Sequence, residues 1–382
     1  MTVGCDPFTF GHIVYCAANV ASVRLDGPLD LMDQWMHHFG KPLPSLRSLE
    51  LIVRPGPRER GSHRTLFLHS HAPSLRRLIL RGMYPPTDTP LPNLSAITLQ
   101  LYKIYAPIHL NSIFASLNNA PNLQELRILL GACEVILSEE VVALGRLEYL
   151  KLVMDGRPLR ILPLMRLPRL RNLTLCVTLH VDFPTVTLAD LLPPSHCISL
   201  TGVGKMTYKV EGARVPSRTV TFSTQHLAVT VFARPDPHIL TDSPFTTWFS
   251  DTSPVSLTQI KKVKVYGPIL PGEIPFAAFE NLEVLNLDGS DHNLTFALLS
   301  ARTAGGLTSC PRLRTLSVRW RCDLDRKGLV RLNTLARRRK AGGSPFDDVS
   351  VVGFVVCQPN LVEELRGYVG SLDLSGVIKD PA

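Results

Sequence analysis

The stretch GVGKM at residues 202–206 raises the question of phosphate chemistry. A phosphate-binding P-loop has the form Gly-x-x-x-x-Gly-Lys-Ser/Thr, in which backbone N–H groups cradle the phosphates and the hydroxyl binds magnesium. Here Ser199 stands where the first glycine is needed, and Met206 stands where the hydroxyl is needed. We therefore do not expect a nucleotide site.

Two other clusters could bind metal ions. His63, His69 and His71 fall within SHRTLFLHSH, but no Cys or carboxylate ligand accompanies them at a defined spacing. Asp323 and Asp325 resemble half of a calcium loop, yet the Gly and Glu of an EF-hand do not follow. We interpret the histidines as solvent-facing or capping residues and the aspartates as helix N-caps.

The remaining chemical signatures are also missing. The chain has 8 cysteines without a Cys-x-x-Cys pair, and it has no Gly-x-Ser-x-Gly motif. No secretory signal is visible, and no apolar run reaches the roughly 18 residues of a membrane span. We expect a non-enzymatic, reduced, intracellular protein, cytoplasmic and/or nuclear, with no metal, no cofactor and no membrane contact.

Charge gives a weaker indication. The 382 residues carry a formal net charge of +9. Such an excess suits nucleic acid, an acidic protein surface or anionic lipid, and it is also common without any of them. ARRRK at 336–340 could be a nuclear-import patch, but cations in the last turn before Gly342 and Gly343 also complement the negative end of a helix. We prefer the second interpretation.

The elements that would carry any site follow from a recurring pattern, Pro-x-Leu-x-x-Leu-x-Leu. Relaxed to L-x-x-L-x-L, the pattern starts at 13 positions from Val20 to Phe346, with a mean spacing of about 27 residues. The matches at Val203, Thr224 and Phe346 are loose. The clearest copies are PSLRSLEL (44–51), PSLRRLIL (73–80), PNLSAITL (92–99), PNLQELRI (121–128), PRLRNLTL (168–175) and PRLRTLSV (311–318).

This spacing predicts an α/β fold, a leucine-rich-repeat solenoid (horseshoe) of about 12–13 irregular repeats. Each L-x-L is a short strand with both leucines on one face, and the first Leu closes the turn into it. Stacked units share one core between a parallel inner sheet and outer helices, expected at 29–40, 110–119 and 324–343. We expect residues 1–19 to form an N-terminal cap or remnant segment and residues 20–375 to form the repeat domain, with an irregular insertion at about 233–256. Residues 376–382 are expected to be a C-terminal tail.

The stretches VASVRLDGPLDLMDQWMHHFGKPLPSLRSLEL, HAPSLRRLILRG, NNAPNLQELRI and SCPRLRTLSV resemble the leucine-rich-repeat region of fungal F-box proteins. The resemblance covers about residues 15–375. It implies a substrate receptor whose N-terminal F-box docks the adaptor of a cullin-type ubiquitin ligase. Only 19 residues precede the first repeat, and none fits an F-box opening, so adaptor binding is expected only if an F-box exists upstream. Either the gene model is then truncated, or the chain is a binding module that no longer docks.

Residues between the leucines should point to the concave face, where the resemblance also places the substrate. At these positions 10 residues are Lys or Arg and 4 are Asp or Glu, which favours a protein partner with an acidic surface. Lys205, His226 and Lys262 are expected side by side as a basic ladder. The predicted partner-binding residues are Arg77, Arg81, Arg127, Tyr149, Lys151, Lys205, Lys209, His226, Lys262, Lys264, Tyr266 and Arg319.

Two alternatives stay open. The chain could be a ubiquitin-independent leucine-rich-repeat scaffold or regulatory binding protein. It could also bind nucleic acid through the basic face, although the aromatic array that stacks single-stranded bases is missing. We do not expect the second alternative.

Overall fold

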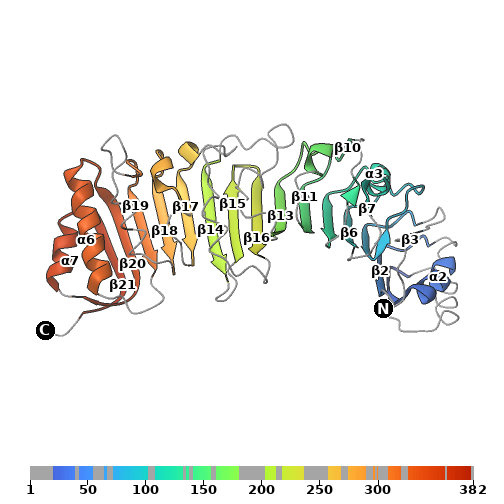
Figure 1. Ribbon diagram of the computed structural model, residues 1–382, viewed down its shortest axis with the longest axis horizontal. Helices are drawn as coiled ribbons and strands as arrows, with labels where there is room; N and C mark the ends of the chain where they lie inside the picture. Colours follow the sequence, from blue (N-terminus) through green and yellow to red (C-terminus); the bar gives the residue numbers. More distant parts are fainter. Residues whose placement is uncertain are drawn as a thin grey trace. The chain divides into compact units, whose positions relative to one another are not determined.

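The computed structural model describes residues 20–38, 43–54, 64–66, 72–101, 108–131, 135–136, 141–155, 161–179, 203–211, 217–235, 257–267, 274–289, 296, 299, 309–319, 326–357 and 359–379. The chain forms two compact units. The N-terminal unit comprises residues 1–179 and 193–199, and the C-terminal unit comprises residues 180–192 and 200–382. Each has an α/β structure with a mostly parallel sheet and few helices, as predicted (Figure 1).

The main sheet of the N-terminal unit is parallel throughout its described strands. Every strand in it contains an L-x-L segment of the pattern and begins one residue before that segment. In order across the sheet they are β1 (Ser22–Pro28), β2 (Ser48–Arg54), β4 (Arg77–Arg81), β6 (Ala96–Leu101), β8 (Glu125–Leu130), β11 (Tyr149–Asp155) and β13 (Asn172–Leu179).

The register of these strands aligns their apolar residues. Leu126 pairs with Leu150, and Leu150 pairs with Leu173, so one row of side chains crosses three strands. All three leucines are at most 1% exposed. The residues between them, such as Arg127, lie on the opposite face and remain partly accessible. This alternation makes one face of the sheet the core and leaves the other free.

A tight turn precedes each strand of this sheet from β2 to β13. The N–H of Leu94 donates to the Leu91 carbonyl at 3.1 Å, and the N–H of Leu123 donates to the Ala120 carbonyl at 3.1 Å. In the Pro-Asn-Leu copies the asparagine amide reaches back to the preceding turn, as Asn122 does to the Pro92 carbonyl at 2.6 Å. The first leucine therefore closes the turn, as expected, because its own N–H completes it.

Return segments in the N-terminal unit are short and varied. They contain α2 (Leu29–His38), α3 (Leu110–Asn118) and the 3-10 turn η2 (Leu162–Leu164), which confirms the helices expected near 29–40 and 110–119. Three small parallel pairs accompany them: β3 (Arg64–Thr65) with β5 (Met83–Tyr84), β7 (Ile108–His109) with β9 (Val135–Ile136), and β10 (Val142–Ala143) with β12 (Met165–Arg166).

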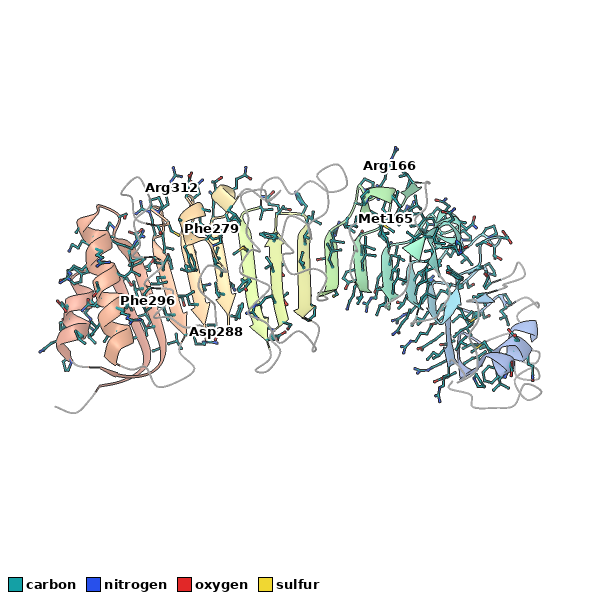
Figure 2. The ribbon with its side chains drawn as sticks, viewed as in Figure 1. Met165, Arg166, Phe279, Asp288, Phe296 and Arg312 are labelled. Atoms are coloured by element: carbon teal, nitrogen blue, oxygen red, sulfur yellow. The ribbon has the colours of Figure 1, made fainter. Side chains whose placement is uncertain are left out.

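The C-terminal unit begins with an antiparallel meander and continues as a parallel sheet. Phe279 and Asp288 lie at opposite ends of β18 (Figure 2). Across the sheet the strands are β16 (Ala228–Pro235), β15 (Ser217–Ser223), β14 (Lys205–Glu211), β17 (Lys262–Tyr266), β18 (Val284–Asp288), β19 (Thr315–Arg319), β20 (Phe346–Cys357) and β21 (Val369–Lys379).

The meander contradicts the prediction of a strand that starts from Thr224 and stacks beside Lys205. Only four residues join β15 to β16, and Thr224 and Leu227 close a hairpin, with the Thr224 N–H donating to the Leu227 carbonyl at 2.8 Å. A parallel crossover needs a dozen residues or more, so a connection this short forces an antiparallel pair. The spacing of 21 residues between Val203 and Thr224 resembled one repeat, but it spans part of a hairpin instead.

Helices cover the end of the C-terminal unit. α6 (Arg326–Ala341), expected at 324–343, packs against β20, and α7 (Pro359–Arg366) packs against both α6 and β21 (Figure 1). The 3-10 turns η3 (Leu257–Gln259) and η4 (Phe276–Ala278) precede β17 and β18. β21 continues beyond residue 375, where the repeat domain was expected to end. Residues 1–19 and 236–256 lie outside the described residues.

Candidate functional site

Near the start of the N-terminal sheet, ion pairs neutralise Arg81 and the neighbouring Arg24 and Arg54. Glu50 on β2 lies between Arg24 at 3.4 Å and Arg81 at 3.6 Å. Asp26 accepts two hydrogen bonds from the Arg54 guanidinium, at 2.7 and 2.9 Å, and this contact lowers the pKa of Asp26. The positive charge of Arg81 is therefore already compensated within the sheet, which leaves less of it to attract a partner.

Farther along the same sheet, Arg127, Tyr149 and Lys151 lie on adjacent strands. Arg127 pairs with Glu125 at 2.5 Å and lies 5.3 Å from the centre of the Tyr149 ring, a cation–π distance. Lys151 sits beside Arg127 on the neighbouring strand and forms no ion pair with another described residue. Arg77 is exposed and likewise makes no ion pair within the described part of the chain.

The densest group of predicted residues lies on β14 and β17 in the C-terminal unit. Lys205 and Lys262 are direct register partners, and Lys264 stands two residues further along β17, beside Thr207 and Asn286. We call Lys205, Lys262 and Lys264, together with Tyr266, the lysine patch. Its lysines are half-buried or exposed, and no described carboxylate forms an ion pair with them.

Carboxylates at the margin of the patch neutralise two neighbouring cations, Lys209 and Arg319. Lys209, the register partner of Tyr266, is ion-paired with Glu211. Arg319 lies 3.8 Å from Asp288, which follows Tyr266 across the sheet. Among the described residues the predicted cations thus fall into paired ones, the single unpaired residues Arg77 and Lys151, and one group of three unpaired lysines on adjacent strands. Adjacent strands lie about 4.8 Å apart, so the like charges of this group repel one another.

His226 does not belong to the predicted ladder. It lies in the hairpin between β15 and β16, where its N–H and that of Leu227 both donate to the Thr224 hydroxyl, at 3.1 and 2.9 Å. Ser223 takes its place as the register partner of Lys205 on β15. The ladder is therefore Ser223, Lys205 and Lys262, and it contains two lysines instead of three cations.

The burial of Arg339 could not be predicted from the sequence. It falls within ARRRK, where the expectation was a row of cations at the helix end, but its side chain is 0% exposed. The guanidinium donates to the carbonyls of Ser309 at 3.2 Å, Cys310 at 3.1 Å and Leu313 at 2.9 Å. It also lies 4.8 Å from the centre of the Phe346 ring. Burial lowers its pKa. Its role is structural.

Metal ligands do not gather anywhere in the described part of the chain: no three His, Cys, Asp or Glu side chains lie close enough to bind an ion. The three histidines at 63, 69 and 71 and the two aspartates at 323 and 325 lie outside the described residues. None of the helices described is both long enough and apolar enough to cross a membrane.

Comparison with known proteins does not assign the chain to a family. No known family matches the chain, and no curated protein sequence matches it significantly.

Proposed function

We propose that the chain is a non-enzymatic leucine-rich-repeat protein that binds an acidic segment of a partner protein through the lysine patch. The repeat assignment is supported by the recurring Leu-closed turn followed by an L-x-L strand, which appears in both units at Leu94, Leu123 and Leu313. Stacked units of this kind present one long polar face, and such faces are typical protein-binding surfaces. Proteins of this architecture that act as F-box receptors hold substrates there.

The uncompensated charge of the lysine patch carries the proposal. Four of the other predicted cations, Arg81, Arg127, Lys209 and Arg319, have a carboxylate partner, whereas Arg77 and Lys151 are single unpaired cations. Only in the lysine patch do unpaired cations lie beside one another on adjacent strands. Lys205, Lys262 and Lys264 lack a carboxylate partner among the described residues, and their mutual repulsion is relieved when carboxylates of a partner approach. Tyr266 is the last residue of β17, at the edge of the patch, and an aromatic ring at this position can pack against apolar parts of the same segment.

Fluorescence anisotropy with a labelled peptide rich in Glu and Leu tests the proposal. We expect binding that weakens as salt rises from about 0.1 M to about 1 M, because the Debye length falls from about 10 Å to about 3 Å. The double variant Lys262→Glu/Lys264→Glu should lose at least about tenfold in affinity, or ~1.4 kcal/mol. His226→Ala is the matched control and should bind as the wild type does.

Two results would contradict the proposal. Equal affinity of the double variant and the wild type would make the patch a solvated surface without a partner. Stronger capture of a single-stranded oligonucleotide than of the acidic peptide would favour the nucleic-acid alternative.

Adaptor binding is a separate prediction. We expect no complex between a purified cullin adaptor and residues 1–382, and size-exclusion chromatography of the mixture tests this expectation.

A further inference from the structure

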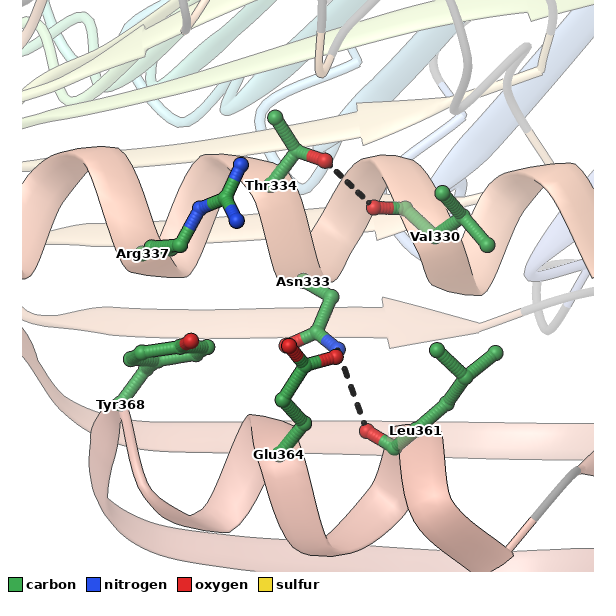
Figure 3. Close-up of a pocket in the computed structure, with 7 residues that line it drawn as sticks. All are labelled: Val330, Asn333, Thr334, Arg337, Leu361, Glu364 and Tyr368. Carbon is green, nitrogen blue, oxygen red and sulfur yellow. Dashed lines mark hydrogen bonds between the residues drawn. The ribbon is translucent and has the colours of Figure 1, made fainter.

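A groove of about 210 Å³ lies between α6 and α7, away from the sheet face described above (Figure 3). α6 contributes Val330, Asn333 and Arg337, α7 contributes Leu361 and Glu364, and Tyr368 follows α7. Pockets for drug-sized ligands usually measure about 300–1,000 Å³. This groove therefore has room for a very small ligand.

Asn333 provides a hydrogen-bonding group in the groove that is not satisfied. The side chain is 5% exposed, and its Nδ2 donates to Glu364 Oε2 at 2.8 Å and to the Leu361 carbonyl at 3.3 Å. Two acceptors around the nitrogen fix the orientation of the amide. Oδ1 is then buried without a partner, an arrangement that costs free energy and calls for a donor.

Opposite charges line the same groove without meeting. Glu364 is held by Asn333, while Arg337 lies over the face of α6 beside Thr334 (Figure 3). Neither forms an ion pair with the other or with any other described residue. The groove thus offers an acceptor-rich corner at Asn333 and Glu364 and a separate guanidinium donor.

Apolar surface completes the lining. Val330 is 41% exposed, which is unusual for a large hydrophobic side chain among the described residues, and Leu361 faces it from α7 (Figure 3). An apolar side chain placed between them would remove both from water. A ligand that satisfies every part of the groove therefore carries a cationic donor, an anionic acceptor and a small apolar group.

We propose that this groove binds a free α-amino acid with an apolar side chain. The ammonium group donates to Asn333 Oδ1 and to the Glu364 carboxylate, and the ligand carboxylate accepts from Arg337. The side chain packs between Val330 and Leu361. A residue inside a peptide lacks both charges and a chain terminus has only one of them, so the free amino acid is the ligand that fits. This site is independent of the proposed function.

Isothermal titration calorimetry of the full chain tests the assignment with three probes. L-leucine carries both charges, N-acetyl-leucine lacks the ammonium, and leucine amide lacks the carboxylate. We expect L-leucine to bind and each of the other two to bind about ten- to a hundredfold more weakly, because each loses charge-assisted hydrogen bonds.

Variants locate the site. Glu364→Gln and Arg337→Gln should each weaken L-leucine binding by about tenfold or more. Glu363→Gln and Arg338→Gln are matched controls on the same two helices that do not line the groove, and they should bind as the wild type does. Circular dichroism confirms that all four variants are folded.

Three outcomes would overturn the proposal. L-leucine could fail to bind at millimolar concentration. N-acetyl-leucine could bind as well as L-leucine, in which case the ammonium contacts do not exist. Leucine amide could bind more tightly than L-leucine, and Arg337→Gln could increase the affinity for leucine amide. The groove would then select a cation, and Arg337 would repel that cation.

Discussion

At the scale of single residues, Arg339 shows how one buried cation organises the start of a strand. The carbonyls of Ser309, Cys310 and Leu313 converge on it from the turn before β19, while its own backbone belongs to α6. A guanidinium has five donors in a rigid plane and can satisfy several carbonyls at once. The side chain therefore ties the helix to the turn that closes the strand.

Arg339→Ala should destabilise the C-terminal unit by about 3 kcal/mol, because three buried carbonyls lose a donor and a cavity remains. Arg338→Ala, one residue away and exposed, should change the free energy of unfolding by less than about 0.5 kcal/mol. Urea unfolding followed by circular dichroism measures both. Equal midpoints for the two variants would mean that Arg339 contributes nothing beyond its neighbour.

Cys310 makes the stability of the same turn depend on pH. Its Sγ donates to the Phe276 carbonyl at 3.0 Å, and burial raises the pKa of the thiol to about 12, although nearby Arg339 opposes the shift. The unfolded thiol ionises near pH 9, so between about pH 9 and 12 the folded state retains a proton that the unfolded state has lost. The contribution of this thiol to the free energy of unfolding is therefore fully present below about pH 9 and is lost as the pH rises from about 9 to about 12.

Cys310→Ala should therefore lose less stability than the wild type when the pH is raised from about 8 to about 10.5. Chemical unfolding at the two pH values gives the comparison. Cys176→Ala is the control: the pKa of that thiol is also raised by burial, but Cys176 is only half-buried and should show a smaller difference. A larger pH effect at Cys176 than at Cys310 would contradict this account.

At the scale of elements, the turn-and-strand pattern could be read from the sequence because local geometry dictates it. An L-x-L segment alternates faces, a proline stops the preceding segment, and both signals lie within eight residues. The antiparallel meander could not be predicted, because TVTF and LAVTVF alternate like the segments that form parallel strands. The connection TQHL also contains no Gly or Pro that would indicate a hairpin. Strand direction was thus set by the length of a connection and not by composition.

Core leucines of adjacent strands give the sharpest test of the register. Leu126→Asp or Leu173→Asp should destabilise the N-terminal unit by several kcal/mol, because either change buries an unpaired charge in one shared row. Asn172→Asp places the same group on the accessible face of β13 and should leave the melting temperature nearly unchanged. Wild-type melting of both leucine variants would show that the register is wrong.

At the scale of the whole molecule, the candidate sites depend on contacts that a linear pattern does not encode. The sequence indicated which residues share the sheet face, and the structure bears this out for Lys205, Lys262 and Lys264. It could not indicate which cations meet a carboxylate, because the Glu50–Arg81 contact requires the pairing of separate strands. Likewise, the groove between α6 and α7 exists only because residues about 30 positions apart face each other.

The net charge of +9 raises one last question, whether acidic partners respond to total charge or to its arrangement. Lys262→Glu/Lys264→Glu lowers the net charge by four. Arg312→Glu/Arg338→Glu lowers it equally at two exposed positions outside the lysine patch. If arrangement decides, only the first double variant should lose affinity for the acidic peptide at about 0.1 M salt, because charges beyond a Debye length of about 10 Å are screened. Equal losses in the two variants would show that long-range attraction drives binding and that Lys205, Lys262 and Lys264 have no special role.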